Sequence, residues 1–177
     1  MSSLRSLVSR AAVPVAGDVS HSSVQLVAIG AYQLHEALRA YHRLDERGCR
    51  ACVAYVLEPG RFREARDALE EQLVARDEEL RSLFPTTLRR IFVTHTRPEP
   101  MVGVLRRLNS GQSQSRFAGF RNRGGTLDVA GMLFTNRCRW AHLVHACAEI
   151  LGTQPEQLLD QAELAALSGH GDPRVVL

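Results

Sequence analysis

The sequence contains no lysine: its 22 basic side chains are all arginine, and they face 19 acidic ones. A Schiff-base lysine, a lysine that grips a nucleotide phosphate and a lysine general base are therefore excluded within this chain. The complete use of arginine predicts a bacterial source with a GC-rich genome. The net charge of only +3 is far from the basic excess of nucleic-acid-binding proteins, so we expect no nucleic-acid partner.

Long apolar runs are missing as well. No stretch of about 20 consecutive apolar residues occurs, which predicts that no helix spans a membrane, and we expect a cytoplasmic protein. Residues 1–17 contain no acidic side chain and no continuous apolar run of the kind found in secretory signals. We interpret residues 1–20 as a flexible linker, residues 21–168 as one domain and residues 169–177, which contain glycine and proline, as a flexible tail.

Cysteine is scarce, and two of the four cysteines, Cys49 and Cys52, have the CxxC spacing of a redox or zinc pair. A redox pair belongs at the start of a helix that follows a strand, whereas this pair falls at the start of an expected strand. A zinc site needs a second ligand pair of similar spacing, and none is evident. We therefore favour a role for both as small, apolar-like core side chains.

The apolar pattern alternates between two periods. Short, mostly apolar runs are typical of parallel strands covered on both faces, and they lie at residues 24–29, 51–57, 90–94 and 116–120. Apolar spacings of three and four predict helices at residues 32–47, 61–84, 101–108, 127–134, 140–151 and 155–167. For the last helix, Thr153 and Glu156 have the spacing of a capping box. The alternation predicts an α/β fold, a three-layer sandwich with a mostly parallel sheet.

Residues 117–143 carry the most specific pattern of the chain. A glycine-rich turn at residues 119–124 is followed, twelve residues after its second glycine, by Asn136, which opens an Asn-x-x-Arg-Trp segment with Arg139 and Trp140. This order resembles the C-terminal domain of phosphoketolases and, more distantly, that of transketolases. Gly30, the Glu-Ala-Leu run at residues 36–38 and His95 also match that family, and the matches extend in one order over residues 18–151.

The resemblance implies a role without chemistry of its own. In that family thiamine diphosphate and a magnesium ion are held by a Gly-Asp-Gly stretch and a spaced Asn in the upstream domains, and this chain has no Gly-Asp-Gly. The resemblance therefore implies that this chain alone binds no cofactor, and that thiamine diphosphate and magnesium belong to partner domains. It implies a module of a phosphoketolase-like (aldehyde-lyase) or transketolase-like (transferase) system of sugar-phosphate metabolism. Its partners would be separate cofactor-binding subunits, further copies of itself, or both.

The sequence departs from the family in its charges. Asn122 and Arg123 stand where the family has two acidic residues, and Cys138 stands where it has an Asp. The local charge is thus reversed, at the expected carboxyl ends of parallel strands, where α/β folds bind ligands. The resulting candidates for an anion site or a subunit interface are His95, Arg97, Arg121, Arg123, Asn136 and Arg139, with Arg137 nearby.

Two other functions stay open. The chain could be a stand-alone enzyme or binding protein that reuses the fold for a phosphorylated sugar or another anion, or it could be an oligomerisation module without a ligand. His142 and His145 lie three residues apart on an expected helix and share a face. A metal site would need a third ligand from elsewhere, so we expect no metal. No residue is assigned a catalytic role.

Overall fold

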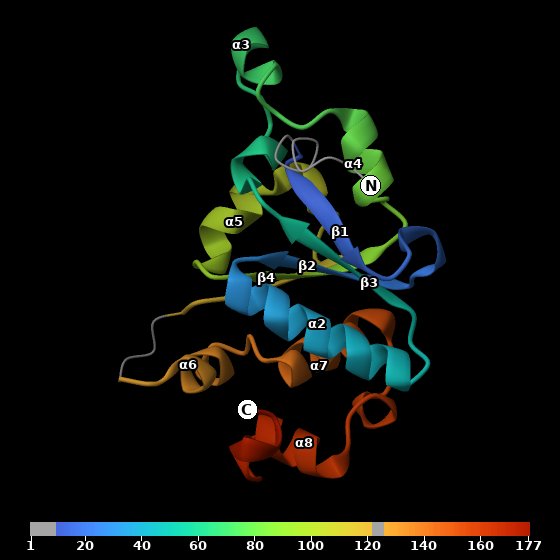
Figure 1. The fold of residues 1–177 in the computed structure, drawn as a ribbon, viewed down its shortest axis with the longest axis vertical. Coiled ribbons are helices and arrows are strands. Elements are labelled where there is room, and N and C mark those ends of the chain that lie inside the picture. The colour runs from blue at the N-terminus through green and yellow to red at the C-terminus, as the bar shows by residue number, and fades with distance from the viewer. Residues whose placement is uncertain (1–9, 122–125) are drawn as a thin grey trace.

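The structure is a computed structural model that describes residues 10–121 and 126–177, and it forms three layers around one five-stranded sheet (Figure 1). The strand order is β1-β3-β2-β4-β5. β2, β3, β4 and β5 run parallel, and β1 pairs antiparallel with β3. The strands are β1 (Ala12–Ala16), β2 (Val24–Ile29), β3 (Ala51–Val56), β4 (Arg89–Thr94) and β5 (Ser115–Gly119). The predicted α/β sandwich with a mostly parallel sheet is confirmed.

The central strands are apolar because helices cover both of their faces. All six residues of β2 are buried, and so are the last five of β4. On one face lie α2 (Ala31–Glu46) and α7 (Trp140–Leu151), with α6 (Val129–Thr135) and α8 (Gln161–Leu167) beyond them. On the other face lie α4 (Asp77–Leu83) and α5 (Pro98–Val104). Alternate residues along each strand therefore pack into two separate hydrophobic cores, one on each face of the sheet.

The expected helix at residues 61–84 is wrong in its extent. The segment instead forms a 3-10 turn (Pro59–Phe62), the single-turn helix α3 (Ala68–Glu71) and α4. Asp67 ends any longer helix, because its side chain accepts hydrogen bonds from the backbone N–H groups of Leu69 and Glu70 and so starts α3 afresh. Leu69 and Leu73 are 72% and 59% exposed, so no buried face sustains a continuous helix here. Figure 1 shows α3 projecting from the body.

Both ends of the chain differ from the expected linker and tail. Ala12–Ala16 form the edge strand β1 within the expected linker at residues 1–20. At the other end, Val176 is fully buried, and its carbonyl oxygen accepts a hydrogen bond of 3.1 Å from Arg139. Composition suggested flexibility at residues 169–177, but the buried Val176 and hydrogen bonds from Arg139 to Val176 and from Arg39 to Leu177 hold this segment against the domain.

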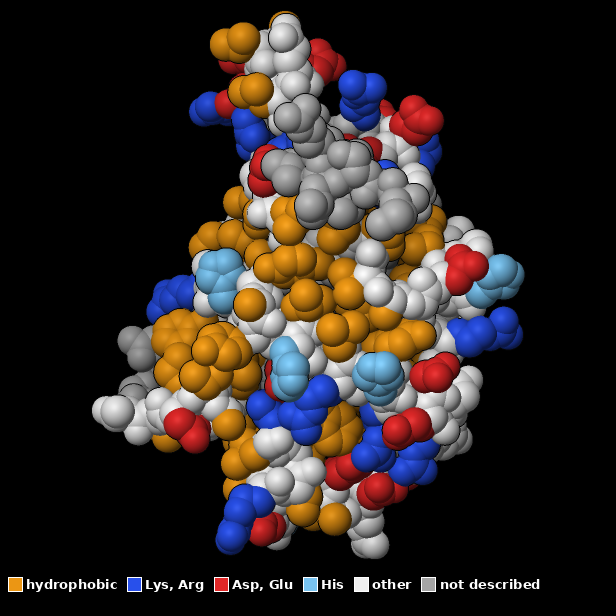
Figure 2. All heavy atoms as spheres, in the orientation of Figure 1, with side chains coloured by type: hydrophobic (Ala, Val, Ile, Leu, Met, Phe, Trp, Pro, Cys, Tyr) orange, Lys and Arg blue, Asp and Glu red, His pale blue; other side chains and the backbone are white. Residues whose placement is uncertain are grey.

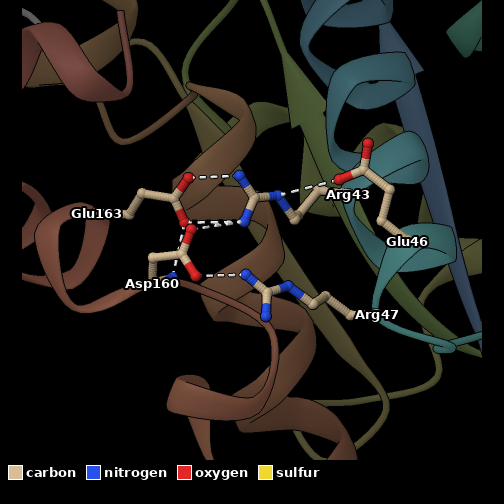
Figure 3. A network of polar contacts seen from close by, with 5 residues as sticks. All are labelled: Arg43, Glu46, Arg47, Asp160 and Glu163. Atoms are coloured by element: carbon tan, nitrogen blue, oxygen red, sulfur yellow. Dashed lines mark hydrogen bonds and ion pairs between the residues drawn. The ribbon is translucent and has the colours of Figure 1, made fainter.

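Helix α8 begins later than expected. Residues 155–157 form a 3-10 turn, and the capping box is made by Asp160 and Glu163, whereas Thr153 and Glu156 have no such role. Asp160 takes over because Arg43 and Arg47 of α2 reach its carboxylate and that of Glu163 (Figure 3). These ion pairs thus favour the capping box at Asp160 and Glu163 over the similar sequence pattern at Thr153 and Glu156. Among the described residues, no helix combines the length and apolarity needed to cross a membrane.

Candidate functional site

His95 lies at the carboxyl end of β4, as the sequence predicted. Its side chain is exposed, and its Nδ1 lies 3.1 Å from the carbonyl oxygen of Ile29, the last residue of the neighbouring β2. A carbonyl oxygen only accepts hydrogen bonds, so this contact places the proton on Nδ1. In the neutral ring Nε2 is then left as an acceptor. His95 can therefore hold the ends of two strands together and still present one nitrogen outward.

Two glycines allow the close approach of these strand ends. Gly30 has φ of +112°, and a Cβ there would lie 2.5 Å from Oε1 of Gln33 and 3.1 Å from the His95 ring. At Gly119, a Cβ would lie 2.5 Å from the carbonyl oxygen of Thr96. Both glycines belong to the pattern on which the resemblance rests, and glycine is needed at each position because a side chain would clash with its neighbours.

Asn136 uses both ends of its side-chain amide to hold the backbone. Its Nδ2 donates to the carbonyl oxygen of Met132 at 2.8 Å, and its Oδ1 accepts from the backbone N–H of Arg121 at 2.5 Å. The buried amide thereby ties the end of α6 to the segment after β5. Arg121 and Arg97 are exposed near the sheet end, whereas Arg123 lies outside the described residues.

The structure separates Arg139 from the other candidates. It is 5% exposed, and its guanidinium donates to Oε1 of Glu36 at 3.1 Å and to Val176. Oε2 of Glu36, which is 1% exposed, accepts from the backbone N–H of Trp140 at 2.8 Å. Arg139 is therefore half of a buried ion pair that joins α2 to the start of α7. Glu36 was missed as its partner, although an acidic residue on the apolar side of a helix was a usable signal.

A small apolar cavity of about 190 Å³ opens beside His95. Its walls include Tyr32, Phe120 and Met132, with Cys138 among the side chains that line it. Burial raises the pKa of the Cys138 thiol to about 12, so no thiolate nucleophile forms there at neutral pH. Hydrophobic side chains gather over α6 on this face (Figure 2), and the exposed ones include Leu127, Val129 and Met132. The sheet end is thus suited to apolar contact rather than to bond-making chemistry.

The same region does not fit a magnesium-bound diphosphate. Magnesium takes carboxylate and other hard oxygen ligands, but no carboxylate of the described residues lines the cavity at the sheet end. Its polar side chains are those of Tyr32, Gln33, Thr94, His95 and Asn136. Among residues 10–121 and 126–177, no three His, Cys, Asp or Glu side chains are grouped to hold a metal ion. Cys49 and Cys52 are free thiols whose pKa is raised by burial, and Cys52 is in the core.

A second cavity, of about 390 Å³, was not anticipated from the sequence. It lies between β5 and the helices α7 and α8. Arg116, Arg121 and Arg137 line it together with His142 and His145. These residues are scattered over 30 positions of the sequence, and only the packing of α7 beside the edge strand brings them together.

No family model matches this sequence, and no curated protein matches it. The comparison with solved structures finds transketolases. A mutant enzyme from Pichia stipitis has a TM-score of 0.57 at 14% identity, over 81% of this chain and 18% of its own. The Campylobacter jejuni enzyme has a TM-score of 0.58 at 13% identity, over 80% of this chain and 19% of its own.

The transketolase of Leishmania mexicana is similar to the same degree, with a TM-score of 0.58 and 15% identity over 84% of this chain. This chain spans 18–19% of the length of these three enzymes. At such low identity the likeness concerns the fold alone. The fold of this chain is that of one transketolase-like α/β domain.

Proposed function

We propose that this chain is a C-terminal-domain-type module of a transketolase-like or phosphoketolase-like enzyme of sugar-phosphate metabolism. The single observation that carries the proposal is the pairing of a fold match over most of this chain with coverage of less than a fifth of each transketolase. A chain of this size supplies one domain of such an enzyme. Its cytoplasmic partners would supply thiamine diphosphate, magnesium and the reacting groups.

The sheet end supports a role in assembly. Its exposed polar groups include Arg97, Arg121 and His95, and beside them lies the apolar surface over α6. Desolvated apolar contacts with a charged rim are the usual composition of a protein interface. We therefore propose that the partner subunit packs on the carboxyl end of the sheet, with its acidic side chains against the two arginines.

Calorimetric titration of the isolated chain with thiamine diphosphate and magnesium tests the proposal. We expect no binding heat, because the donor set does not fit the metal–diphosphate group. Binding with a micromolar Kd would overturn the assignment of the cofactor to another chain.

The positive arm searches the genes that flank this one for a chain with a Gly-Asp-Gly stretch and a spaced Asn, and co-expresses that chain with this one. Co-expression should give a complex that transfers or cleaves ketose phosphates only when both chains are present. The double variant Val129→Asp, Met132→Asp, which places charge on the apolar surface over α6, should abolish the complex while leaving the isolated chain folded. A complex that forms equally well with this variant would contradict the proposed interface.

A second candidate is a stand-alone protein that binds a phosphorylated sugar at the sheet end. The observation that favours it is that Arg97, Arg121 and His95 are exposed there and form no ion pair among the described residues. Ribose 5-phosphate should then raise the Tm, and His95→Ala and Arg97→Ala should remove the rise. An unchanged Tm across a panel of sugar phosphates would count against this candidate.

A further inference from the structure

The larger cavity exists because small side chains lie where the sheet edge meets the helical layer. Ala118 of β5 and Ala146 of α7 both line it, and α8 closes one side with Leu164 and Leu167. The volume of about 390 Å³ is within the range of small-molecule sites in proteins. β5 is the last strand of the sheet, so the cavity lies at an edge that no further strand of the described chain covers.

The polar part of the lining is mainly cationic. Arg116, Arg121 and Arg137 are exposed, and none of them forms an ion pair with a described residue. The one acidic side chain of the lining, Glu149, lies 3.7 Å from His145 on the same helix. Three guanidinium groups without a described ion pair lie around one concave surface, where they attract anions and can bind carboxylate or phosphate through two parallel hydrogen bonds.

His142 contributes its ring to the same wall. The ring makes an edge contact with Phe134, and its Nδ1 is buried away from the cavity without a hydrogen-bond partner in the described structure. Burial, aided by Arg137 and His145, lowers the pKa of His142 to about 4. The ring is therefore neutral at physiological pH and can donate or accept one hydrogen bond.

We propose that the cavity between β5, α7 and α8 binds a small organic anion whose carboxylate or phosphate group meets Arg116, Arg121 and Arg137 and whose apolar body lies against Leu143, Leu164 and Leu167. The lining combines apolar side chains with exposed arginines, so we expect a ligand that has an apolar part as well as a negative charge. This site shares Arg121 with the sheet-end interface of the proposed function, and its other residues lie between β5, α7 and α8. It does not depend on a cofactor-binding partner.

Calorimetric titration of the purified chain with phenyl phosphate, benzoate and inorganic phosphate tests the proposal. We expect phenyl phosphate or benzoate to bind at least about tenfold more tightly than inorganic phosphate, because only the first two carry an apolar body. The stronger of the two identifies the anionic group. The absence of binding heat with all three probes would overturn the proposal.

Three variants locate the binding. Arg137→Ala should weaken the binding of the tighter probe about tenfold or more. Arg81→Ala is the control, because it removes the same charge from the exposed surface of α4 on the other face of the sheet, and it should leave the affinity unchanged. Ala146→Leu should abolish binding by filling the cavity without changing any charge. Equal losses in Arg137→Ala and Arg81→Ala would indicate nonspecific attraction and contradict the site. Folding of each variant is checked by circular dichroism, and Arg137→Gln serves as a second variant if Ala146→Leu fails to fold.

Solution mass distinguishes a ligand site from an interface. The chain should have the same mass by light scattering with and without the tighter probe, and in wild type and Arg137→Ala. A dimer that dissociates when the probe is added, or when Arg137 is replaced, would show that a second copy covers the cavity and would overturn the small-molecule proposal.

Discussion

Glu36 places a carboxylate inside the core, where a charge is stable only if it is paired and hydrogen-bonded. It accepts hydrogen bonds from the guanidinium of Arg139 and from the backbone N–H of Trp140. One side chain of α2 thus satisfies both the charge and an otherwise unpaired N–H group in the first turn of α7. The Asn-x-x-Arg-Trp segment of the sequence is explained by this arrangement: Asn136 ends α6 and the Arg-Trp pair meets Glu36.

Glu36→Gln should destabilise the fold by about 3–5 kcal/mol, because it leaves the buried guanidinium of Arg139 without a counter-charge. Glu46→Gln is the matched control, since Glu46 is mostly exposed and lies 3.6 Å from Arg43. Glu46→Gln should lower the free energy of unfolding by less than about 1 kcal/mol. Urea unfolding followed by circular dichroism measures both. Equal unfolding free energies for the two variants would contradict the role given to Glu36.

His142 predicts a pH dependence of stability. In the unfolded chain this histidine binds a proton near pH 6.5, whereas the folded chain lowers its pKa to about 4. Between these values the unfolded state binds more protons, so the contribution of His142 to stability is complete above pH 6.5 and is lost as the pH falls towards 4.

His142→Gln should flatten this dependence, measured as the change in unfolding free energy between about pH 4.5 and about pH 7. His170→Gln is the control and should keep the wild-type slope, because His170 is exposed and is not among the groups that lower the pKa of His142. A wild-type slope in His142→Gln would show that other groups cause the acid sensitivity.

At the scale of elements, ion pairs add to the apolar packing that attaches α8 to the body. Nη1 of Arg43 lies 3.1 Å from Oε2 of Glu163, and the same carboxylate accepts from the backbone N–H of Asp160 at 2.8 Å (Figure 3). Arg47, the residue that follows α2, forms an ion pair with Asp160. One acidic residue therefore caps α8 and docks it against α2 at the same time.

Glu163→Gln should weaken this attachment by about 1–2 kcal/mol. The amide protons at residues 164–167 should then exchange roughly tenfold faster, since each 1.4 kcal/mol is a factor of ten. The amides of β2 and β4 should be unaffected. Glu156→Gln is the control, because Glu156 lies in the exposed turn before α8 and was the capping residue expected from the sequence. Uniformly faster exchange across the sheet would indicate global destabilisation and contradict a local role.

At the scale of the whole molecule, the central strands could be predicted because a strand that is buried on both faces is a continuous run of apolar residues. β2 and α7 begin and end where expected. β1 was missed because AVPVA is short and contains Pro14, which an edge strand tolerates next to its register shift. The Glu36–Arg139 pair joins residues 103 positions apart, and no local pattern specifies such a partner.

The C-terminal segment tests how far the domain extends. Val176→Ser should cost about 2 kcal/mol of unfolding free energy, because it places a hydroxyl in the core and removes a buried side chain. Val175→Ser is a neighbouring control, since Val175 is 46% exposed. Its effect should be within about 0.5 kcal/mol. Equal effects in thermal or urea unfolding would restore the interpretation of residues 169–177 as a tail.

The place of Val176 has a consequence for synthesis on the ribosome. The core beneath α2 is completed by α7, α8 and Val176, which all come from the last quarter of the chain, whereas the opposite core uses residues no later than Phe117. A nascent chain that has emerged as far as β5 therefore has one finished side and one bare apolar side. We therefore expect chaperone contact with the side that α2 covers to last until α7, α8 and Val176 have all left the exit tunnel.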